Sequence, residues 1–232
     1  MNKVLNDLYD YGLKIYQDCD GFKFSLDSIL LAEAVKLKKN DVLLDFCCGT
    51  APVLLILSTK YSNKMYGIEL QKEICDLARE NIEINNLESQ ISIINDNIKN
   101  SLNYFPGNNL DVITCNPPFF KVNDTALINK NLTKAISRHE LAASLEDYIN
   151  MAYKLLKSNG TLYFIYRVER LQELFCYLSN YSFSVKELIF FKTNEAKNEI
   201  TMVLIKAVKN GNIGLKTRVV ETYRNLSYKN II

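Results

Sequence analysis

Short, mostly apolar runs alternate with helical patterns through the first half of the chain. The runs cover residues 41–46, 64–69, 91–96 and 110–115. Between the second and third runs, residues 72–85 place their apolar side chains on one face of a helix. Another helix begins near Pro52, directly after the first run. Strands that alternate with helices predict a parallel sheet covered on both faces.

The second half of the chain continues with a helix, a strand and a further helix. Residues 141–156 predict a helix with a C-terminal cap at Asn159 and Gly160. Residues 161–166 predict a fifth strand, and residues 169–178 the next helix. The second half therefore continues the alternation of strands and helices.

Two β-rich runs close the pattern, at residues 185–191 and 200–208, and a polar linker joins them. They predict an antiparallel hairpin. Ahead of the sheet, residues 22–27 predict a short extended piece and the following apolar residues a helix. The fold class is α/β.

Composition places this pattern in one domain, residues 1–232. The chain has 232 residues, of which 48% are hydrophobic and 23% charged, enough for one large core. The N-terminus shows an early acid and no apolar leader, and no apolar run reaches the roughly 18 residues of a membrane span, so we expect a soluble, cytoplasmic protein. Six cysteines without a C-x-x-C pair and one histidine argue against a metal site. A monomer is favoured.

Positive charge gathers in two segments of the chain. Residues 119–138 and 206–232 each carry more Lys and Arg than Asp and Glu. Two interpretations stand side by side: a rim that binds a polyanion, or lysine-rich loops and tails that only keep the protein in solution.

A rigid corner follows the fourth strand, at Asn116-Pro117-Pro118-Phe119. The prolines have fixed φ angles and no N–H, so the corner offers hydrogen-bond acceptors. The Asn116 side-chain oxygen and a backbone carbonyl can each accept one hydrogen of an exocyclic amine, while Phe119 packs on the ring that carries it. The plainer interpretation is a strand-ending turn.

Acidic residues stand at the ends of the other predicted strands. Asp45, Glu69 and Asp96 join Asn116 in ending or directly following a strand. Ligands of open α/β sheets bind outside the carboxyl ends of the strands, so these side chains should converge on one crevice, with Glu69 placed to hold ribose hydroxyls. Each also has a structural interpretation, as a cap, a solvated strand end or a turn residue.

These motifs resemble the class I S-adenosylmethionine-dependent methyltransferases, within them the amino-methylating branch marked by Asn-Pro-Pro-aromatic. The chain is most similar to the bacterial enzymes that methylate N6 of adenosine 37 in a valine tRNA. The resemblance covers Phe22 to about Val208 and includes residues 43–51 as the cofactor loop and residues 24–31 and 138–140 as marks of the subgroup. It implies a Rossmann-like, seven-stranded, mostly parallel sheet.

The resemblance also implies site roles. It assigns catalysis to Asn116, Pro117, Pro118 and Phe119. S-adenosylmethionine would be held by residues at the strand ends and in the N-terminal extension, residues 1–40, which would pack near the cofactor: Phe24, Asp27, Asp45, Cys47, Gly49, Glu69, Leu70, Asp96, Asn97 and Asn116. The tRNA would be held by the basic segments, including a C-terminal tail over 208–232: Lys121, Lys130, Lys134, Arg138, His139, Lys216, Arg218 and Arg224.

The cofactor loop departs from the family pattern. Cys47 and Ala51 occupy places usually held by glycine, which restricts the turn. The alternatives are N6-adenine methylation of ribosomal RNA or DNA, methylation of a protein glutamine, and a non-catalytic RNA-binding partner.

Overall fold

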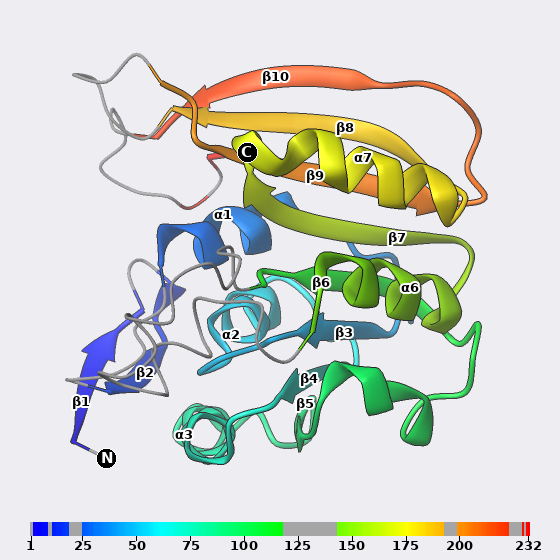
Figure 1. Cartoon of the computed structure of the whole chain (residues 1–232). Helices are drawn as coiled ribbons and strands as arrows, with labels where there is room; N and C mark the ends of the chain where they lie inside the picture. Colours follow the sequence, from blue (N-terminus) through cyan, green and yellow to red (C-terminus); the bar gives the residue numbers. More distant parts are fainter. Residues whose placement is uncertain are drawn as a thin grey trace, which may run out of the picture.

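The computed structural model describes residues 2–8, 11–18, 25–117, 143–192, 199–222, 229 and 231–232. Its centre is an eight-stranded sheet (Figure 1), with strand order β10-β8-β9-β7-β6-β3-β4-β5. The strands are β3 (Leu43–Phe46), β4 (Met65–Glu69), β5 (Ile91–Asn95), β6 (Leu110–Cys115), β7 (Leu156–Arg167), β8 (Phe183–Lys192), β9 (Met202–Lys209) and β10 (Lys216–Glu221). β9 is antiparallel to β7 and β8, and the other pairs are parallel.

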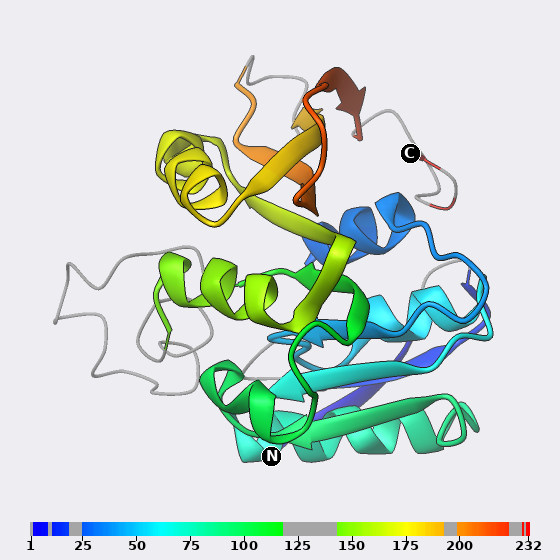
Figure 2. The same cartoon turned by 90° about the vertical axis from the view of Figure 1, so that its right-hand side faces the viewer.

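Helices cover both faces of this sheet, as the alternating pattern predicted. The helices are α1 (Leu26–Ala34), α2 (Pro52–Ser58), α3 (Lys72–Glu83), α6 (Leu145–Leu155) and α7 (Leu171–Asn180), with the 3-10 turns η2 (Ile98–Asn103) and η3 (Val168–Arg170). Figure 2 shows α1 and α2 on one side of the sheet and α6 and α7 on the other. Two buried apolar clusters fill the two interfaces. Within the described residues, no helix is both long and apolar enough to cross a membrane.

The antiparallel hairpin of β8 and β9 and the strands β3 to β7 confirm the sequence prediction. The α/β class is confirmed too, and the sheet adds an eighth strand to the expected seven. α1 starts at Leu26, so the end of the predicted extended piece is helical.

An N-terminal hairpin that the sequence did not predict packs beside α3. It consists of β1 (Lys3–Asp7) and β2 (Lys14–Asp18). Two asparagines of α3 make the hydrogen bonds that a neighbouring strand would make. The side-chain oxygen of Asn81 accepts from the N–H of Tyr16, and its Nδ2 donates to the carbonyl of Tyr16. Asn85 makes the same two bonds to the backbone of Lys14. These bonds satisfy the edge of β2, which would otherwise need water or another strand.

The predicted helix cap at Asn159 and Gly160 is wrong. α6 ends at Leu155, because Leu156 is already extended with φ −68° and ψ 139°. Asn159 has φ 64°, but it lies within β7. The pairing of β6 with β7 shifts register between Leu110 and Val112, so the left-handed residue marks a bulge.

The basic C-terminal segment is also different from a simple tail. Residues Lys216–Glu221 form the edge strand β10, parallel to β8. Lys209 is only 4% exposed. Its ammonium donates to Asn108 Oδ1 at 2.7 Å, to the carbonyl of Leu156 at 2.8 Å and to that of Tyr153 at 2.5 Å. Lys209 therefore closes the C-terminal end of α6 and is not part of a basic rim.

We expect Lys209→Met to lower the free energy of unfolding by about 2–3 kcal/mol, because it leaves buried carbonyl groups without a donor. Urea unfolding of the parent and the variant measures the difference. Lys154→Met, at an exposed position on α6, is the matched control and should change stability by less than about 0.5 kcal/mol. Equal losses in both variants would contradict the structural role of Lys209.

Candidate functional site

The strands β3, β4, β5 and β6 are parallel, so their carboxyl ends lie together at one end of the sheet. Asp45 on β3 stands in register with Gly67 on β4 and with Thr114 on β6. Asp45 is 1% exposed, and Thr114 Oγ1 donates to its Oδ1 at 2.6 Å. Burial raises the pKa of Asp45 to about 7. The hydrogen bond from Thr114 lowers this pKa, and the negative charge of the nearby Glu69 raises it further. Asp45 and Glu69 therefore lie close together at this end of the sheet.

The loop between β3 and α2 has a glycine-like backbone although it contains only one glycine. Cys47, Gly49 and Ala51 have φ of 54°, 55° and 68°. The left-handed region costs an L residue on the order of 1 kcal/mol, so packing must hold Cys47 and Ala51 there. Cys47 and Ala51 therefore adopt left-handed backbone without being glycine.

Gly67 makes room for this loop. A Cβ built at Gly67 would lie 2.7 Å from Cys48 Sγ and 2.9 Å from Leu54 Cδ1. The loop and the first turn of α2 therefore pack directly on the backbone of β4. A glycine inside a strand often marks such a close approach.

Glu69 connects β4 to the same loop. It is 8% exposed, its Oε2 accepts from the N–H of Gly49 at 3.1 Å, and its Oε1 accepts from the N–H of Gln71 at 2.9 Å. Burial raises the pKa of Glu69, and these backbone donors oppose the rise. The backbone N–H of Leu70 is a third donor, and a carboxylate has about four acceptor positions, so the group can still accept from a ligand hydroxyl.

Asp96 and Asn97 stabilise their own turn. Asp96 accepts from the N–H of Asn97, from Asn100 Nδ2 at 2.8 Å and from Tyr104 OH at 2.8 Å, and these bonds to its charged form lower its pKa. The Asn97 side chain caps η2 by accepting from the N–H of Lys99. The turn-pair interpretation of these two residues therefore has direct structural support, and a cofactor role for them stays a prediction.

Asn116 follows β6 and contacts the first turn of α1. Its Nδ2 donates to Ser28 Oγ at 3.1 Å. Among the residues that the structure describes, no donor reaches Asn116 Oδ1, so the side chain presents a free acceptor. Pro117 is buried directly after it. The acceptor corner proposed from the sequence stays a prediction, because Pro118 and Phe119 lie outside the described residues.

Three further residues support the site and were missed from the sequence. Asn81 is fully buried, and its Nδ2 donates to the carbonyl of Thr50 at 3.0 Å as well as to β2. Tyr148 OH lies 3.3 Å from Cys47 Sγ. Ser28 orients Asn116. A polar residue on the buried face of an amphipathic helix was the available signal for Asn81.

The other predicted cofactor residues differ in placement. Asp27 lies in the first turn of α1, accepts from Ser25 Oγ at 2.9 Å and has its pKa raised by burial. Leu70 is 39% exposed just beyond β4. Several predicted residues lie outside the described residues: Phe24, Pro118, Phe119, Lys121, Lys130, Lys134, Arg138, His139 and Arg224. Lys216 and Arg218 are exposed on β10, at the far edge of the sheet.

Within the described residues, no group of three or more His, Cys, Asp or Glu side chains could hold a metal ion. Five cysteines are free thiols there, and burial raises the pKa of Cys47, Cys48 and Cys115. These thiols are therefore protonated and pack as small apolar groups.

Comparison with known families identifies the family of the chain. Residues 23–176 match the model of the methyltransferase small domain, which covers more than half of the chain. The chain belongs to this family. Its methyltransferase assignment agrees with the resemblance drawn from the sequence, and the matched range contains β3 to β7, with the loop after β3 and Asn116.

Individual relatives agree with the family. The chain is 24% identical over 187 residues to the tRNA1(Val) (adenine(37)-N6)-methyltransferase of Aliivibrio salmonicida, covering 80% of this chain and 77% of the relative. It is 32% identical over 141 residues to the protein of the same name from Porphyromonas gingivalis, covering 60% and 54%. A predicted O-methyltransferase from Agrobacterium tumefaciens shares the fold, with a TM-score of 0.67, 17% identity and coverage of 89% and 96%.

The pKa of Asp45 predicts how stability depends on pH. Between pH 3.8 and about 7 the folded protein keeps a proton that the unfolded chain has released, so the free energy of unfolding falls as pH rises. Asp45→Asn removes this fall. Its stability relative to the parent should increase by about 3 kcal/mol between pH 5 and pH 8, since about two pH units lie between pH 5 and the folded pKa and each is worth about 1.4 kcal/mol.

Urea unfolding at both pH values tests this, with Asp7→Asn on the exposed strand β1 as the control that should show no such change. A relative stability of Asp45→Asn that is the same at pH 5 and pH 8 would show that Asp45 ionises normally.

Proposed function

We propose that this protein transfers a methyl group from S-adenosylmethionine to N6 of an adenosine in RNA, namely adenosine 37 in the anticodon loop of a valine tRNA. The names of its curated relatives support the substrate. The observation that carries the proposal is the contact of Asn116 with Ser28, which leaves one acceptor at the end of β6. An anticodon-loop base is already unpaired, so it can reach Asn116 at lower cost than a base in a duplex.

Asn116 accounts for the chemistry required of the protein. The lone pair of adenine N6 is delocalised into the ring, which makes the amine a weak nucleophile. Asn116 Oδ1 would accept one N6 hydrogen, and a backbone carbonyl of the Asn-Pro-Pro corner would accept the other. Both bonds orient the lone pair away from the acceptors, and Phe119 would stack on the base. No strong base is needed until the proton leaves.

The residues at the strand ends fit the cofactor. When bound, S-adenosylmethionine supplies an electrophilic methyl group. Glu69 would hold the ribose hydroxyls, and the loop of residues 47–51 would approach through its backbone. The buried Oγ1 of Thr50 in this loop lacks a hydrogen-bond partner among the described residues, so the loop has polar capacity left for a ligand. Asp27, Asp45, Leu70 and the Asp96 turn would complete the cofactor site.

The remaining assignments follow from the tRNA substrate. We assign the whole chain to one domain whose N-terminal extension packs near the cofactor and whose basic residues, including Lys216 and Arg218, contact RNA phosphates. With tRNA as its substrate, we expect the protein to act in the cytoplasm.

Replacing Glu69 with alanine should weaken cofactor binding by about 1.5–3 kcal/mol, the scale of hydrogen bonds to a charged group. Isothermal titration calorimetry with S-adenosylmethionine measures the loss. Glu88→Ala, at an exposed position, is the control and should bind as the parent does. Unchanged affinity in Glu69→Ala would remove Glu69 from the cofactor site.

Replacing Asn116 with alanine should lower kcat at least about a hundredfold and leave cofactor affinity within a few-fold, as for the loss of a preorganised hydrogen bond. Ser28→Ala should lower kcat less, because Asn116 keeps its acceptor and loses only its orientation. Mass spectrometry of nucleosides from reacted tRNA provides the readout, N6-methyladenosine. If the parent forms none, the substrate is wrong; if Asn116→Ala loses cofactor binding and turnover equally, the role of Asn116 is wrong.

A further inference from the structure

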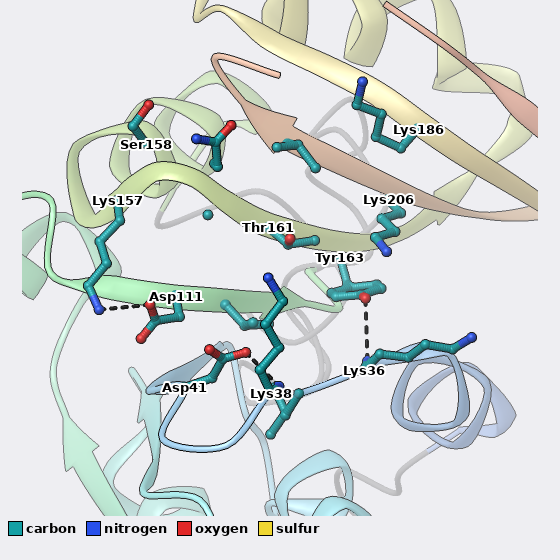
Figure 3. Close-up of a pocket in the computed structure, with 15 residues that line it drawn as sticks. Lys36, Lys38, Asp41, Asp111, Lys157, Ser158, Thr161, Tyr163, Lys186 and Lys206 are labelled. Atoms are coloured by element: carbon teal, nitrogen blue, oxygen red, sulfur yellow. Dashed lines mark hydrogen bonds and ion pairs between the residues drawn. The ribbon is translucent and has the colours of Figure 1, made fainter. Parts of the chain in front are cut away.

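A concave site lies at the opposite end of the sheet from Asn116. It is a pocket of about 510 Å³, bounded by the segment after α1, the starts of β6 and β7, and the paired strands β8 and β9 (Figure 3). The volume lies within the range of ligand sites. The bulge of residues 157–160, which interrupts the pairing of β6 and β7, forms part of its wall.

The lining of the pocket is strongly basic. Five lysines and two aspartates contribute to it: Lys36, Lys38, Lys157, Lys186, Lys206, Asp41 and Asp111. The whole chain has a net charge of only +2, so this pocket concentrates positive charge. A concave basic surface focuses the field and attracts anions.

The lysines differ in how far their charge is already neutralised. Lys157 Nζ pairs with Asp111 Oδ1 at 2.7 Å, and Lys186 donates to the carbonyl of Asn212. Lys206 Nζ lies 5.6 Å from the centroid of the Tyr163 ring. In the described part of the chain, the ammonium groups of Lys36 and Lys38 have no acceptor. These two are available to an anion.

The positive surface continues out of the pocket to the edge of the sheet. Lys216 on β10 is in register with Glu187 on β8, and Glu187 is in register with Lys206 on β9. Register partners point to the same face, so Lys216 and Lys206 share one face. Between them, Glu187 is paired with Arg218, whose Nε lies 3.2 Å from its Oε1. A surface that continues beyond its pocket suits an extended polyanion better than a small one.

We propose that this basic pocket and the start of β10 bind backbone phosphates of the RNA substrate, remote from the reacting base. The inference rests on the proposed RNA substrate and adds a contact at the opposite end of the molecule. β6 has six residues, so at about 3.3 Å per residue the two ends of the sheet are roughly 20 Å apart. At this distance we expect a complete tRNA, which extends well beyond its anticodon hairpin, to contact the pocket more extensively than the hairpin alone.

The test compares two double variants that remove the same charge. Lys36→Gln/Lys38→Gln changes exposed residues of the pocket, and Lys64→Gln/Lys154→Gln changes exposed lysines outside the pocket. Fluorescence anisotropy measures the affinity of each protein for full-length tRNA and for an anticodon stem-loop at several salt concentrations. Circular dichroism confirms that each variant is folded.

The pocket variant should bind full-length tRNA about five- to tenfold more weakly, with a log–log salt slope that is smaller by about 1–2, because up to two phosphate contacts are lost. Its affinity for the stem-loop and for S-adenosylmethionine should remain within twofold. The control variant should bind both RNAs within twofold of the parent.

Three results would overturn the proposal: unchanged tRNA binding by the pocket variant, an equal loss in the control variant, or an equal loss on the stem-loop. Calorimetry with pyrophosphate adds a further outcome. If pyrophosphate binds the parent and not the pocket variant while tRNA binding is unchanged, the pocket holds a small anion. These readouts need no methyl transfer, so an absence of N6-methyladenosine would refute the proposed function and leave the RNA contact intact.

Discussion

The close approach of the loop after β3 to the backbone of β4 is the constraint on which the site depends. Gly67 has no Cβ, so Cys48 and Leu54 pack where a side chain would stand. Glu69, two residues later on the same strand, accepts from Gly49 in that loop. Steric room and a buried hydrogen bond thus hold the loop at the edge of the sheet, where α2 begins.

This constraint explains how the loop tolerates its shortage of glycine. Cys47 and Ala51 hold left-handed φ values that cost an L residue energy, and both lie where packing and hydrogen bonds leave little choice. Tyr148 lies against Cys47, Asn81 donates to Thr50, and Ala51 is fully buried. The shape that glycine supplies through its own freedom is here imposed by neighbours from α3 and α6.

Asn81 also shows how the N-terminal hairpin and the crevice share one support. Its amide bonds both the backbone of Tyr16 in β2 and the carbonyl of Thr50 in the loop. Asn81 and Thr50 are both fully buried, so losing the Asn81 side chain would leave the carbonyl of Thr50 without its donor. The hairpin is therefore part of the structure that positions the loop.

Local patterns in the sequence determined the elements with strong signals. The apolar runs fixed the positions of β3 to β6 because parallel strands are buried on both faces, and the strand-end acids followed from that register. The acceptor role of the Asn-Pro-Pro corner was predicted from its residue types alone. Family membership followed from these same motifs.

Only the tertiary structure decided features that depend on distant partners. The edge strand β10 forms because β8 offers it a free edge, and Lys209 is buried because α6 ends beside it and needs a donor. The end of α6 at Leu155 is set by pairing of Leu156 with β6, against the cap signal at Asn159 and Gly160. The orientation of Asn116 depends on Ser28, and the basic pocket gathers lysines from four separate segments. A charge or an amide in the sequence does not reveal its partner, because folding chooses the partner.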